Sequence, residues 1–187
     1  ELVRCKAAYG ASDPRTAQAA RDLALFLVRQ RVTADAGRAL VEAIRMDENA
    51  LGASHALTLG DVAELASVSP RERAEPLWIR ASRTSDPLVA ARALAALGQF
   101  RESAGNRPAA AKLYRDSLAK EEAGSGRDSP RVAVRLNALA RVVEAEQAIP
   151  LLERALGINR SKLGPRHLET ATAASNLANL LLATGKW

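Results

Sequence analysis

The sequence is poor in cysteine and in aromatic residues, with one cysteine, two Trp, two Tyr and two Phe among 187 residues. One thiol can form neither an intrachain disulfide framework nor a thiolate metal cluster, so both are excluded. Cys5 is therefore expected to be an inert packing residue. No apolar run approaches the roughly 20 residues that cross a bilayer, and the first residues lack a signal-peptide pattern. These absences favour a soluble, cytoplasmic protein and leave the compartment open.

The charge of the chain has no strong pattern. The net charge of +6 comes from 27 basic and 21 acidic residues, and 22 of the basic residues are arginine. Proteins that bind single-stranded nucleic acids combine a basic groove with aromatic stacking platforms. Here the acids are interleaved with the arginines, and aromatic residues are too few for such platforms. We therefore interpret the charges as a solvated surface and place nucleic-acid binding last among the candidate functions.

Side chains that could perform chemistry are scarce. His55 and His167 occupy equivalent places in two loops, where we expect them to begin helices rather than to bind a metal. The pairs Asp47-Glu48 and Glu121-Glu122 are expected at helix ends facing turns, and acid–base catalysis would also require a pocket. No glycine-rich turn carries the lysine and hydroxyl residue of a phosphate loop. The sequence thus predicts no catalytic residue, no metal site and no cofactor, hence a protein that is not an enzyme.

What the sequence does contain is a repeat. One segment occurs four times, as Ala36-Gly-Arg-Ala-Leu, Ala74-Glu-Pro-Leu-Trp, Ala110-Ala-Lys-Leu-Tyr and Ala148-Ile-Pro-Leu-Leu. The intervals of 38, 36 and 38 residues are typical of stacked repeats rather than of a globular fold. Each repeat is too short to bury its apolar face alone, so neighbouring repeats stack and leave an extended surface suited to binding.

A second pattern alternates with the first. Ala- and Leu-rich stretches begin at Pro14, Ala56, Pro87, Pro130 and Leu168, preceded by Asp13, His55, Asp86, Ser129 and His167. Asp or Ser before Pro indicates a helix start, because the side-chain oxygen accepts from backbone N–H groups and proline needs no partner there. Each repeat is therefore predicted to be an A helix followed by a B helix. Apolar residues recur at three- and four-residue steps and no alternating pattern occurs, so the expected fold class is all-α.

Small residues hold fixed places within these helices. They stand late in the A helices at Ala24, Ala66, Gly98, Ala140 and Ala178, and early in the B helices at Ala36, Ala74, Ala110 and Ala148. We expect two helix backbones to approach most closely at these places, because a larger side chain would force the helices apart at a cost of about 1–3 kcal/mol.

The stretch from Leu163 to Trp187 contains Leu163-Gly-Pro-Arg-His, Thr170-Ala-Thr, Asn176-Leu-Ala and Gly185-Lys-Trp. It resembles the tetratricopeptide repeats of the kinesin-light-chain-like type, and Ala148 to Ile158 resembles their B-helix pattern. The resemblance covers essentially the whole chain and implies a right-handed superhelix, a solenoid of antiparallel helix pairs with about four and a half repeats. It also implies a scaffold for protein–protein interaction without naming a partner, since a repeat fold hosts many functions.

The predicted repeats span residues 13–51, 52–84, 85–126 and 127–163, with partial repeats at 1–12 and 164–187. We treat 1–187 as one array. Because arrays normally end in polar capping repeats, we expect an excerpt of a longer repeat protein, whose uncapped ends would allow self-association. The second and fourth repeats are four residues shorter between their A and B helices than the first, so long and short repeats are expected to alternate.

The resemblance implies that the A helices line a concave groove. The predicted partner-binding residues are Arg21, Arg29, Arg92, Gln99, Asn137, Arg141, Asn176 and Asn179. Asparagine amides can hold the backbone of an extended peptide, and arginines bind carboxylates. We therefore predict a protein or peptide partner, acidic or mixed in charge. The alternative is a regulatory or sensor segment of a multidomain signalling enzyme whose catalytic domain lies outside these residues.

Overall fold

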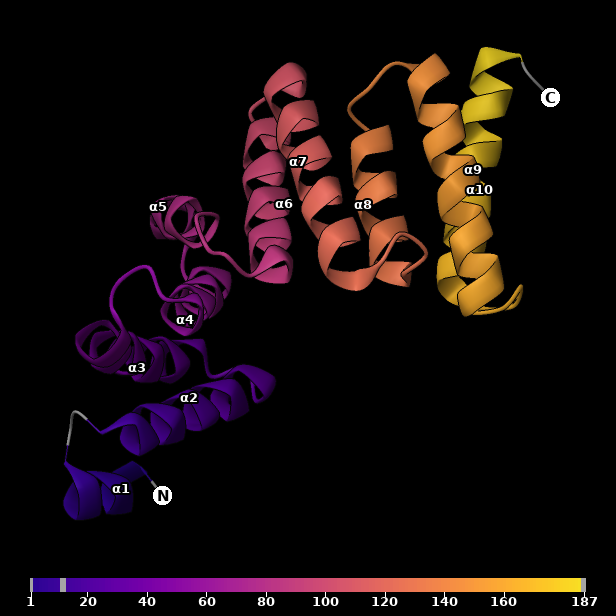
Figure 1. Ribbon diagram of the computed structural model, residues 1–187. Coiled ribbons are helices and arrows are strands. Elements are labelled where there is room, and N and C mark those ends of the chain that lie inside the picture. The colour runs from indigo at the N-terminus through magenta and orange to yellow at the C-terminus, as the bar shows by residue number, and fades with distance from the viewer. Residues whose placement is uncertain (1, 11–12, 186–187) are drawn as a thin grey trace. The chain divides into compact units, whose positions relative to one another are not determined.

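The computed structural model describes residues 2–10 and 13–185, and this part of the chain is helical throughout, without a strand (Figure 1). The expectation of an all-α fold is thus confirmed. The helices are α1 (Leu2–Tyr9), α2 (Pro14–Arg29), α3 (Thr33–Leu51), α4 (Ala56–Val68), α5 (Arg71–Ala81), α6 (Pro87–Ser103), α7 (Arg107–Ser125), α8 (Pro130–Ala140), α9 (Ala145–Lys162) and α10 (Leu168–Thr184). Even-numbered helices are A helices and odd-numbered helices are B helices.

Consecutive helices pack against each other within two compact parts of the chain, Glu1–Ala93 and Leu94–Trp187, here the N-terminal and C-terminal parts. In the N-terminal part the contacts run from α1 to α2, α3, α4 and α5 in order. In the C-terminal part α7 contacts α8, α8 contacts α9, and α9 contacts α10. Each part is therefore a stack in which a helix touches its neighbours in sequence, as expected for a repeat array.

Every A helix begins at a side-chain cap. The capping residues accept a hydrogen bond from the backbone N–H two residues further on, in the pairs Asp13 with Arg15, His55 with Leu57, Asp86 with Leu88, Ser129 with Arg131 and His167 with Glu169. In both histidines the acceptor is Nδ1. The histidines therefore act at helix starts, as the sequence predicts.

A threonine closes the loop before three of these helices. Its hydroxyl donates to the carbonyl of a glycine six residues earlier, in the pairs Thr16 with Gly10 at 2.8 Å, Thr58 with Gly52 at 3.0 Å and Thr170 with Gly164 at 2.8 Å. The three glycines have φ of 86°, 97° and 91°, a conformation that side chains with a Cβ rarely adopt. This explains why a glycine and a threonine recur with fixed spacing around the capping residue.

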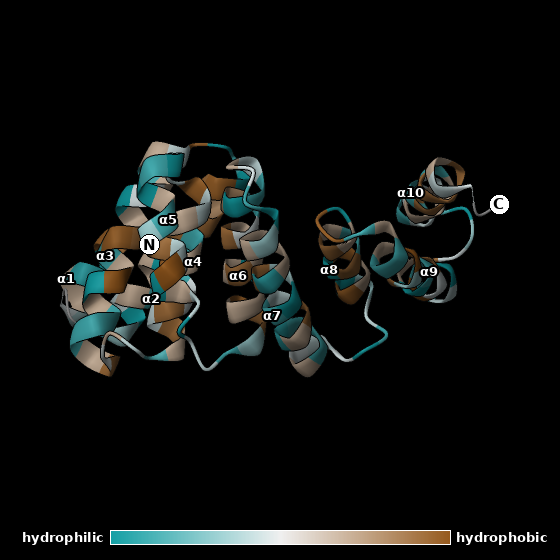
Figure 2. Ribbon diagram, turned by 90° about the horizontal axis from the view of Figure 1, so that it is seen from above, coloured by the Kyte–Doolittle hydropathy of each residue, from teal (hydrophilic) through white to brown (hydrophobic). Residues whose placement is uncertain are grey.

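The small residues that begin the B helices lie where helices approach, as predicted, whereas Ala178 of α10 is exposed. Ala36, Ala74, Ala110 and Ala148 are all buried at the starts of B helices. Figure 2 shows hydrophobic and hydrophilic residues on the same helices, so the apolar faces are stripes rather than whole helices. A close approach involves Gly98 of α6, where an added Cβ would lie 2.7 Å from Cε1 of Tyr114.

Long and short A helices alternate, which confirms the expected difference between repeats. The helices α4 and α8 have 13 and 11 residues, whereas α2 and α6 have 16 and 17. Ser69 and Pro70 separate α4 from α5, and a turn before Ala145 separates α8 from α9. The residues that the second and fourth repeats lack are therefore missing from the ends of α4 and α8.

Candidate functional site

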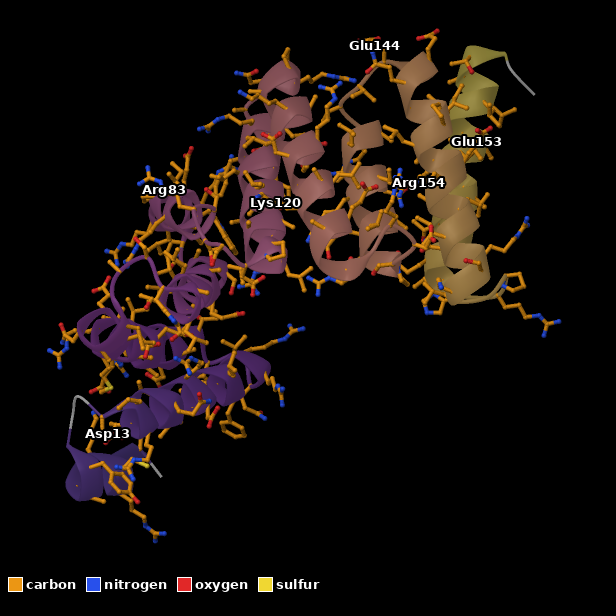
Figure 3. The ribbon with its side chains drawn as sticks, in the orientation of Figure 1. Asp13, Arg83, Lys120, Glu144, Glu153 and Arg154 are labelled. Carbon is orange, nitrogen blue, oxygen red and sulfur yellow. The ribbon has the colours of Figure 1, made fainter. Side chains whose placement is uncertain are left out.

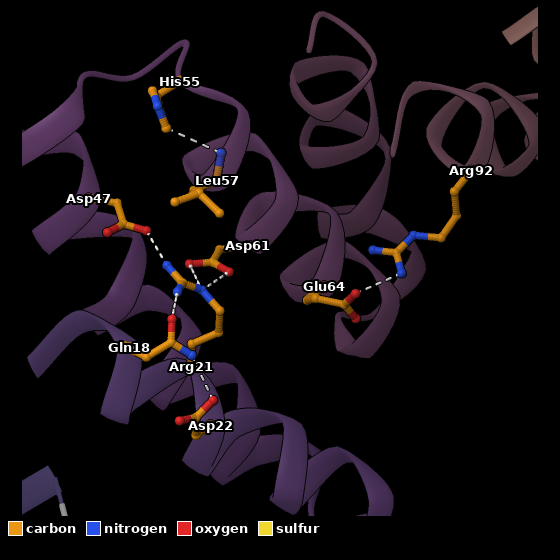
Figure 4. Close-up of polar contacts among 9 residues, drawn as sticks. All are labelled: Gln18, Arg21, Asp22, Asp47, His55, Leu57, Asp61, Glu64 and Arg92. Carbon is orange, nitrogen blue, oxygen red and sulfur yellow. Dashed lines mark hydrogen bonds and ion pairs between the residues drawn. The ribbon is translucent and has the colours of Figure 1, made fainter. Parts of the chain in front are cut away.

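Arg21, from α2, lies between two carboxylates of neighbouring helices (Figure 4). Its Nε donates to Asp61 of α4 at 2.8 and 3.0 Å, and its two terminal nitrogens donate to Asp47 of α3 at 2.5 Å and to Gln18 at 2.6 Å. The side chains of Arg21 and of the two aspartates are mostly buried, with Arg21 14% exposed, Asp47 5% and Asp61 4%. Arg21 therefore holds three helices together, and its guanidinium is already engaged within the protein.

The two carboxylates of this network share one cation. Burial raises the pKa of Asp61 to about 6, against the opposing effect of the hydrogen bonds from Arg21. The nearby charge of Asp47 raises the pKa of Asp61 further. Because a single guanidinium cannot compensate two buried carboxylates, the folded protein favours one bound proton at mildly acidic pH.

The burial of Asp47 corrects the sequence analysis, which placed the acidic pairs at helix ends facing turns. Asp47 is 3% exposed and Glu121 is fully buried, and both lie between helices. Glu121 of α7 pairs with Arg131 at 2.9 Å and with Arg135 at 3.2 Å, both from α8. The end of a B helix is covered by the A helix that follows, so a carboxylate there must find an internal cation.

Arg92 of α6 is also engaged inside the N-terminal part. Its Nη1 donates to Glu64 of α4 at 2.7 Å (Figure 4), and its guanidinium carbon lies 5.6 Å from the ring centroid of Trp78 in α5. Arg29 is exposed in the last turn of α2. The N-terminal part thus holds three of the predicted groove arginines, two of them in ion pairs with its own acids.

In the C-terminal part, Arg141 joins a three-residue network. Its Nε and Nη2 each donate to a carboxylate oxygen of Glu102 at 3.1 Å, and Tyr114 Oη donates to the same carboxylate at 2.6 Å. These hydrogen bonds, first that from Arg141, lower the pKa of Glu102. Burial, followed by the hydrogen bond to Glu102, raises the pKa of Tyr114. Arg141 itself is 52% exposed and remains accessible to a ligand.

A pocket of about 440 Å³ brings half of the predicted groove residues together. Its lining includes Asn137 and Arg141 at the end of α8, and Asn176 and Asn179 of α10. Asn176 Nδ2 lies 3.5 Å from Asn137 Oδ1, and Asn137 Nδ2 donates to the carbonyl of Ala133 at 3.0 Å. Gln99 is exposed on α6 and does not line this pocket. Two successive A helices therefore present amide groups to one opening.

The B helices contribute residues to this pocket that were not among the predicted groove residues. Arg107 begins α7, and its Nη2 lies 3.4 and 3.5 Å from the carbonyls of Arg141 and Val143. Glu144 stands at the N-cap position of α9 without a side-chain capping hydrogen bond, and Figure 3 shows it beside the turn from α8. Apolar side chains that include Leu152 and Leu180 line the pocket too. Arg107, at the start of α7, contacts the end of α8, the A helix of the following repeat, and Glu144 directly follows that end. Helix starts that border the end of an A helix are therefore the signal that would have located both residues.

Other kinds of site find little support in the part of the chain that the structure describes. It contains no group of three or more His, Cys, Asp or Glu side chains placed to hold a metal ion. None of its helices combines the length and apolar character needed to cross a membrane. The pocket with its asparagines is therefore the candidate site.

The fold, the alternating helix pairs and the pocket lined by two A helices define a helical-repeat solenoid. The family model described as tetratricopeptide repeat matches residues 144–187. No curated protein matches the chain. The chain thus shows the tetratricopeptide-repeat fold that the sequence predicts, a fold that generally serves protein–protein interaction.

Solved structures of other proteins share this fold. A putative kinesin light chain of Podosopora anserina with nearly identical TPR-like repeats has 18% identity and a TM-score of 0.70, covering 93% of this chain and 89% of that chain. A single-residue variant of that protein gives 19% identity and a TM-score of 0.71, with 92% and 88% covered. BtubC (BKLC) from P. vanneervenii gives 22% identity and a TM-score of 0.66, with 83% of this chain but 66% of that chain covered. The likeness to kinesin-light-chain-like repeats is therefore one of fold.

Proposed function

We propose that the C-terminal part binds an extended peptide segment of a partner protein in the pocket between α8, α10 and the start of α9. The observation that carries the proposal is the gathering of Asn137, Asn176 and Asn179 with Arg141 around one opening. Its volume of about 440 Å³ falls within the range of ligand sites. The proposed role is that of an interaction module, with no catalytic step assigned to the chain.

The asparagines suit a peptide backbone. An amide side chain offers two N–H donors and one acceptor, matching the carbonyl and N–H groups of an extended strand. One N–H of Asn137 is used by the carbonyl of Ala133, whereas Asn176 and Asn179 are exposed along α10. The backbone would thus run across α10 toward α8, with an apolar side chain of the peptide against Leu152 and Leu180.

The charges around the pocket support a mixed rather than a purely acidic peptide. Arg107 and Arg141 are balanced by Glu102 and Glu144, and Glu102 already pairs with Arg141. A peptide carboxylate would be attracted to the side of Arg107, where the guanidinium makes long contacts to two carbonyls. A single exposed pair of this kind adds about 0–1 kcal/mol, so we assign it selectivity rather than affinity.

A displayed library of random peptides, selected against the chain, tests the proposal. Selected peptides are expected to bind the Asn137→Ala/Asn176→Ala variant about tenfold more weakly or worse, since each lost hydrogen bond costs about 0.5–1.5 kcal/mol. The matched control is Asn49→Ala, an exposed asparagine on α3, which should leave binding unchanged. The proposal fails if no peptide is enriched, or if both variants bind the enriched peptides as the native chain does.

A further inference from the structure

The outer face of α10 repeats a face that α2 buries. Aligning Leu177-Ala178 with Leu23-Ala24 places Ala171, Ala174, Ala178 and Leu181 at the positions of Ala17, Ala20, Ala24 and Leu27. The residue types are identical at all four positions. The three alanines of α2 are at most 2% exposed, whereas the three alanines of α10 are exposed. The same apolar stripe is therefore covered in one place and open in the other.

In the N-terminal part the stripe is covered by α3. Ala24 packs with Ala39 and Leu40 of α3, and Leu40 is fully buried. In the C-terminal part α9 covers α8 in the same way, with Ala155 and Ile158 against the buried Leu136. Alanines let a helix backbone approach closely, so the stripe on α10 has the shape that accepts a B helix and in particular the face of α3.

Ion pairs between successive B helices provide a second, independent observation. The residue four positions before the glycine that ends a B helix pairs with an opposite charge on the next B helix. These pairs are Lys6 with Glu42, Glu48 with Arg80, and Glu122 with Arg154 at 2.6 Å. Figure 3 shows the last of these arginines on α9. Opposite signs therefore mark the correct register between neighbouring B helices.

Arg160 stands at the same position in α9, four residues before Gly164, and is exposed. It corresponds to Lys6, the basic residue that pairs with Glu42 of α3. The apolar stripe and this charge therefore call for the same kind of helix. A basic residue at the place of Glu42 would instead be repelled by Arg160.

We propose that α10 and Arg160 together form a docking surface for an amphipathic helix with the face of α3. Such a helix carries a small residue, a leucine four positions later and a carboxylate six positions after the small residue, as Ala36, Leu40 and Glu42 do. The small residue and leucine pack on the alanine stripe of α10, and the carboxylate pairs with Arg160. This surface is separate from the peptide pocket, so the two proposals stand or fall independently.

The probe is a labelled synthetic peptide of residues 33–51 carrying Asp47→Asn. The change is needed because Ser175 stands on α10 where α2 has Arg21, the partner of Asp47. Titrated against the whole chain, the peptide is expected to bind saturably by fluorescence anisotropy. The same peptide with Glu42→Lys should bind about five- to tenfold more weakly, because an exposed attraction becomes a repulsion.

The reciprocal change supplies the control. In the chain carrying Arg160→Glu, the Glu42→Lys peptide should regain affinity and the Glu42 peptide should lose it. Lys112→Glu, which makes the same charge change at an exposed site on α7, should leave the order of the two peptides unchanged. Ala174→Arg, at an exposed position in the middle of the stripe, should abolish binding of both.

Three results would overturn the proposal. One is no saturable binding, and another is equal affinity for the two peptides, which would indicate apolar adhesion without the register. The third concerns a second copy as the occupant: a chain that sediments as a dimer, becomes a monomer on Ala174→Arg and fails to bind the peptide would show α10 pairing with itself.

Discussion

At the scale of single residues, the contact between Gly98 and Tyr114 fixes how closely α6 and α7 approach. The phenol ring is buried, and its hydroxyl is held by Glu102 at 2.6 Å. A Cβ at residue 98 would lie 2.7 and 2.8 Å from two ring carbons. The other repeats place an alanine at this A-helix position, and the corresponding B-helix residues are Leu40, Trp78 and Leu152. The glycine and the tyrosine thus form a matched pair.

Gly98→Ala is therefore expected to lower the free energy of unfolding by about 1–3 kcal/mol, because the ring has no space to move. In the Tyr114→Leu background the same change should raise it, since alanine favours a helix over glycine by about 1 kcal/mol. Urea unfolding of the four proteins of this cycle measures the coupling. Gly157→Ala, at a helical glycine with open space around it, is the control and should stabilise. Equal effects of Gly98→Ala in both backgrounds would contradict the assigned contact.

Among the residues that the structure describes, Arg31 is the one other than glycine that has a positive φ, of 60°. It follows α2 at the position that Gly105 and Gly185 hold after α6 and α10, with φ of 75° and 67°. The bond from Val32 N–H to the Leu27 carbonyl closes the helix end around it, as in a Schellman motif. Arginine thus occupies a place that suits glycine.

We expect Arg31→Gly to raise the free energy of unfolding by about 1 kcal/mol, because the strain of a left-handed side chain is removed. The reciprocal Gly105→Arg should lower it by a similar amount. Thermal unfolding of both variants measures the pair of effects. A loss of stability in Arg31→Gly would mean that contacts of the arginine side chain outweigh the backbone strain.

At the scale of helices, the network of Arg21, Asp47 and Asp61 makes stability depend on pH. The pKa of Asp61 in the folded protein is about 6, which exceeds the pKa of about 4 for an aspartate in the unfolded chain. The folded state therefore binds the proton more tightly, and stability is highest below about pH 4 for this group and falls as pH rises toward 6. The whole effect is on the order of 2–3 kcal/mol.

Asp61→Asn removes this titration, so its stability deficit relative to the native chain should shrink between pH 4.5 and pH 7. Urea unfolding of both proteins at the two pH values measures the difference. The stability deficit of Glu102→Gln should change with pH in the opposite direction. Arg141 lowers the pKa of Glu102, so the contribution of Glu102 to stability is lost on acidification. A deficit for Asp61→Asn that stays constant with pH would show that Asp61 is ionised throughout.

Sequence patterns predicted the helices better than the contacts of their polar residues. Local signals define the caps, since Ser129 and the proline after it act within one turn. The alternating lengths of the A helices were also readable, because they are differences in spacing. Arg21 and Asp47 were misjudged because they are 26 residues apart and lie on different helices. Their burial depends on which charges meet across a stack, and a single sequence gives no direct signal for that.

Some residues of the candidate site could be predicted from the sequence, and others could not. Counting from the packing residues of the A helices placed Asn137 and Asn176 at one pocket, because equivalent positions on successive repeats lie side by side. Arg107 and Glu144 were not predicted, because they come from the starts of B helices and only A-helix positions were considered. Helix phase was therefore predictable, whereas the contribution of the helix ends required the structure.

At the scale of the whole molecule, each compact part has a core of its own. Ala24, Ala39 and Leu40 form a buried cluster in the N-terminal part, and Leu136 belongs to another in the C-terminal part. Each helix contacts its neighbours in sequence within each part. In such a stack, stability is close to a sum of repeat and interface contributions, so damage to one core is expected to stay local.

Leu40→Ala should therefore remove amide protection in α2 and α3 while leaving α8 and α9 nearly unchanged, and Leu136→Ala should do the reverse. Both leucines are fully buried, so each substitution costs about 2–5 kcal/mol and the two variants serve as controls for each other. Hydrogen exchange followed by mass spectrometry measures protection helix by helix. Equal loss of protection in both parts for either variant would contradict local stability and would show that the chain opens as one cooperative unit.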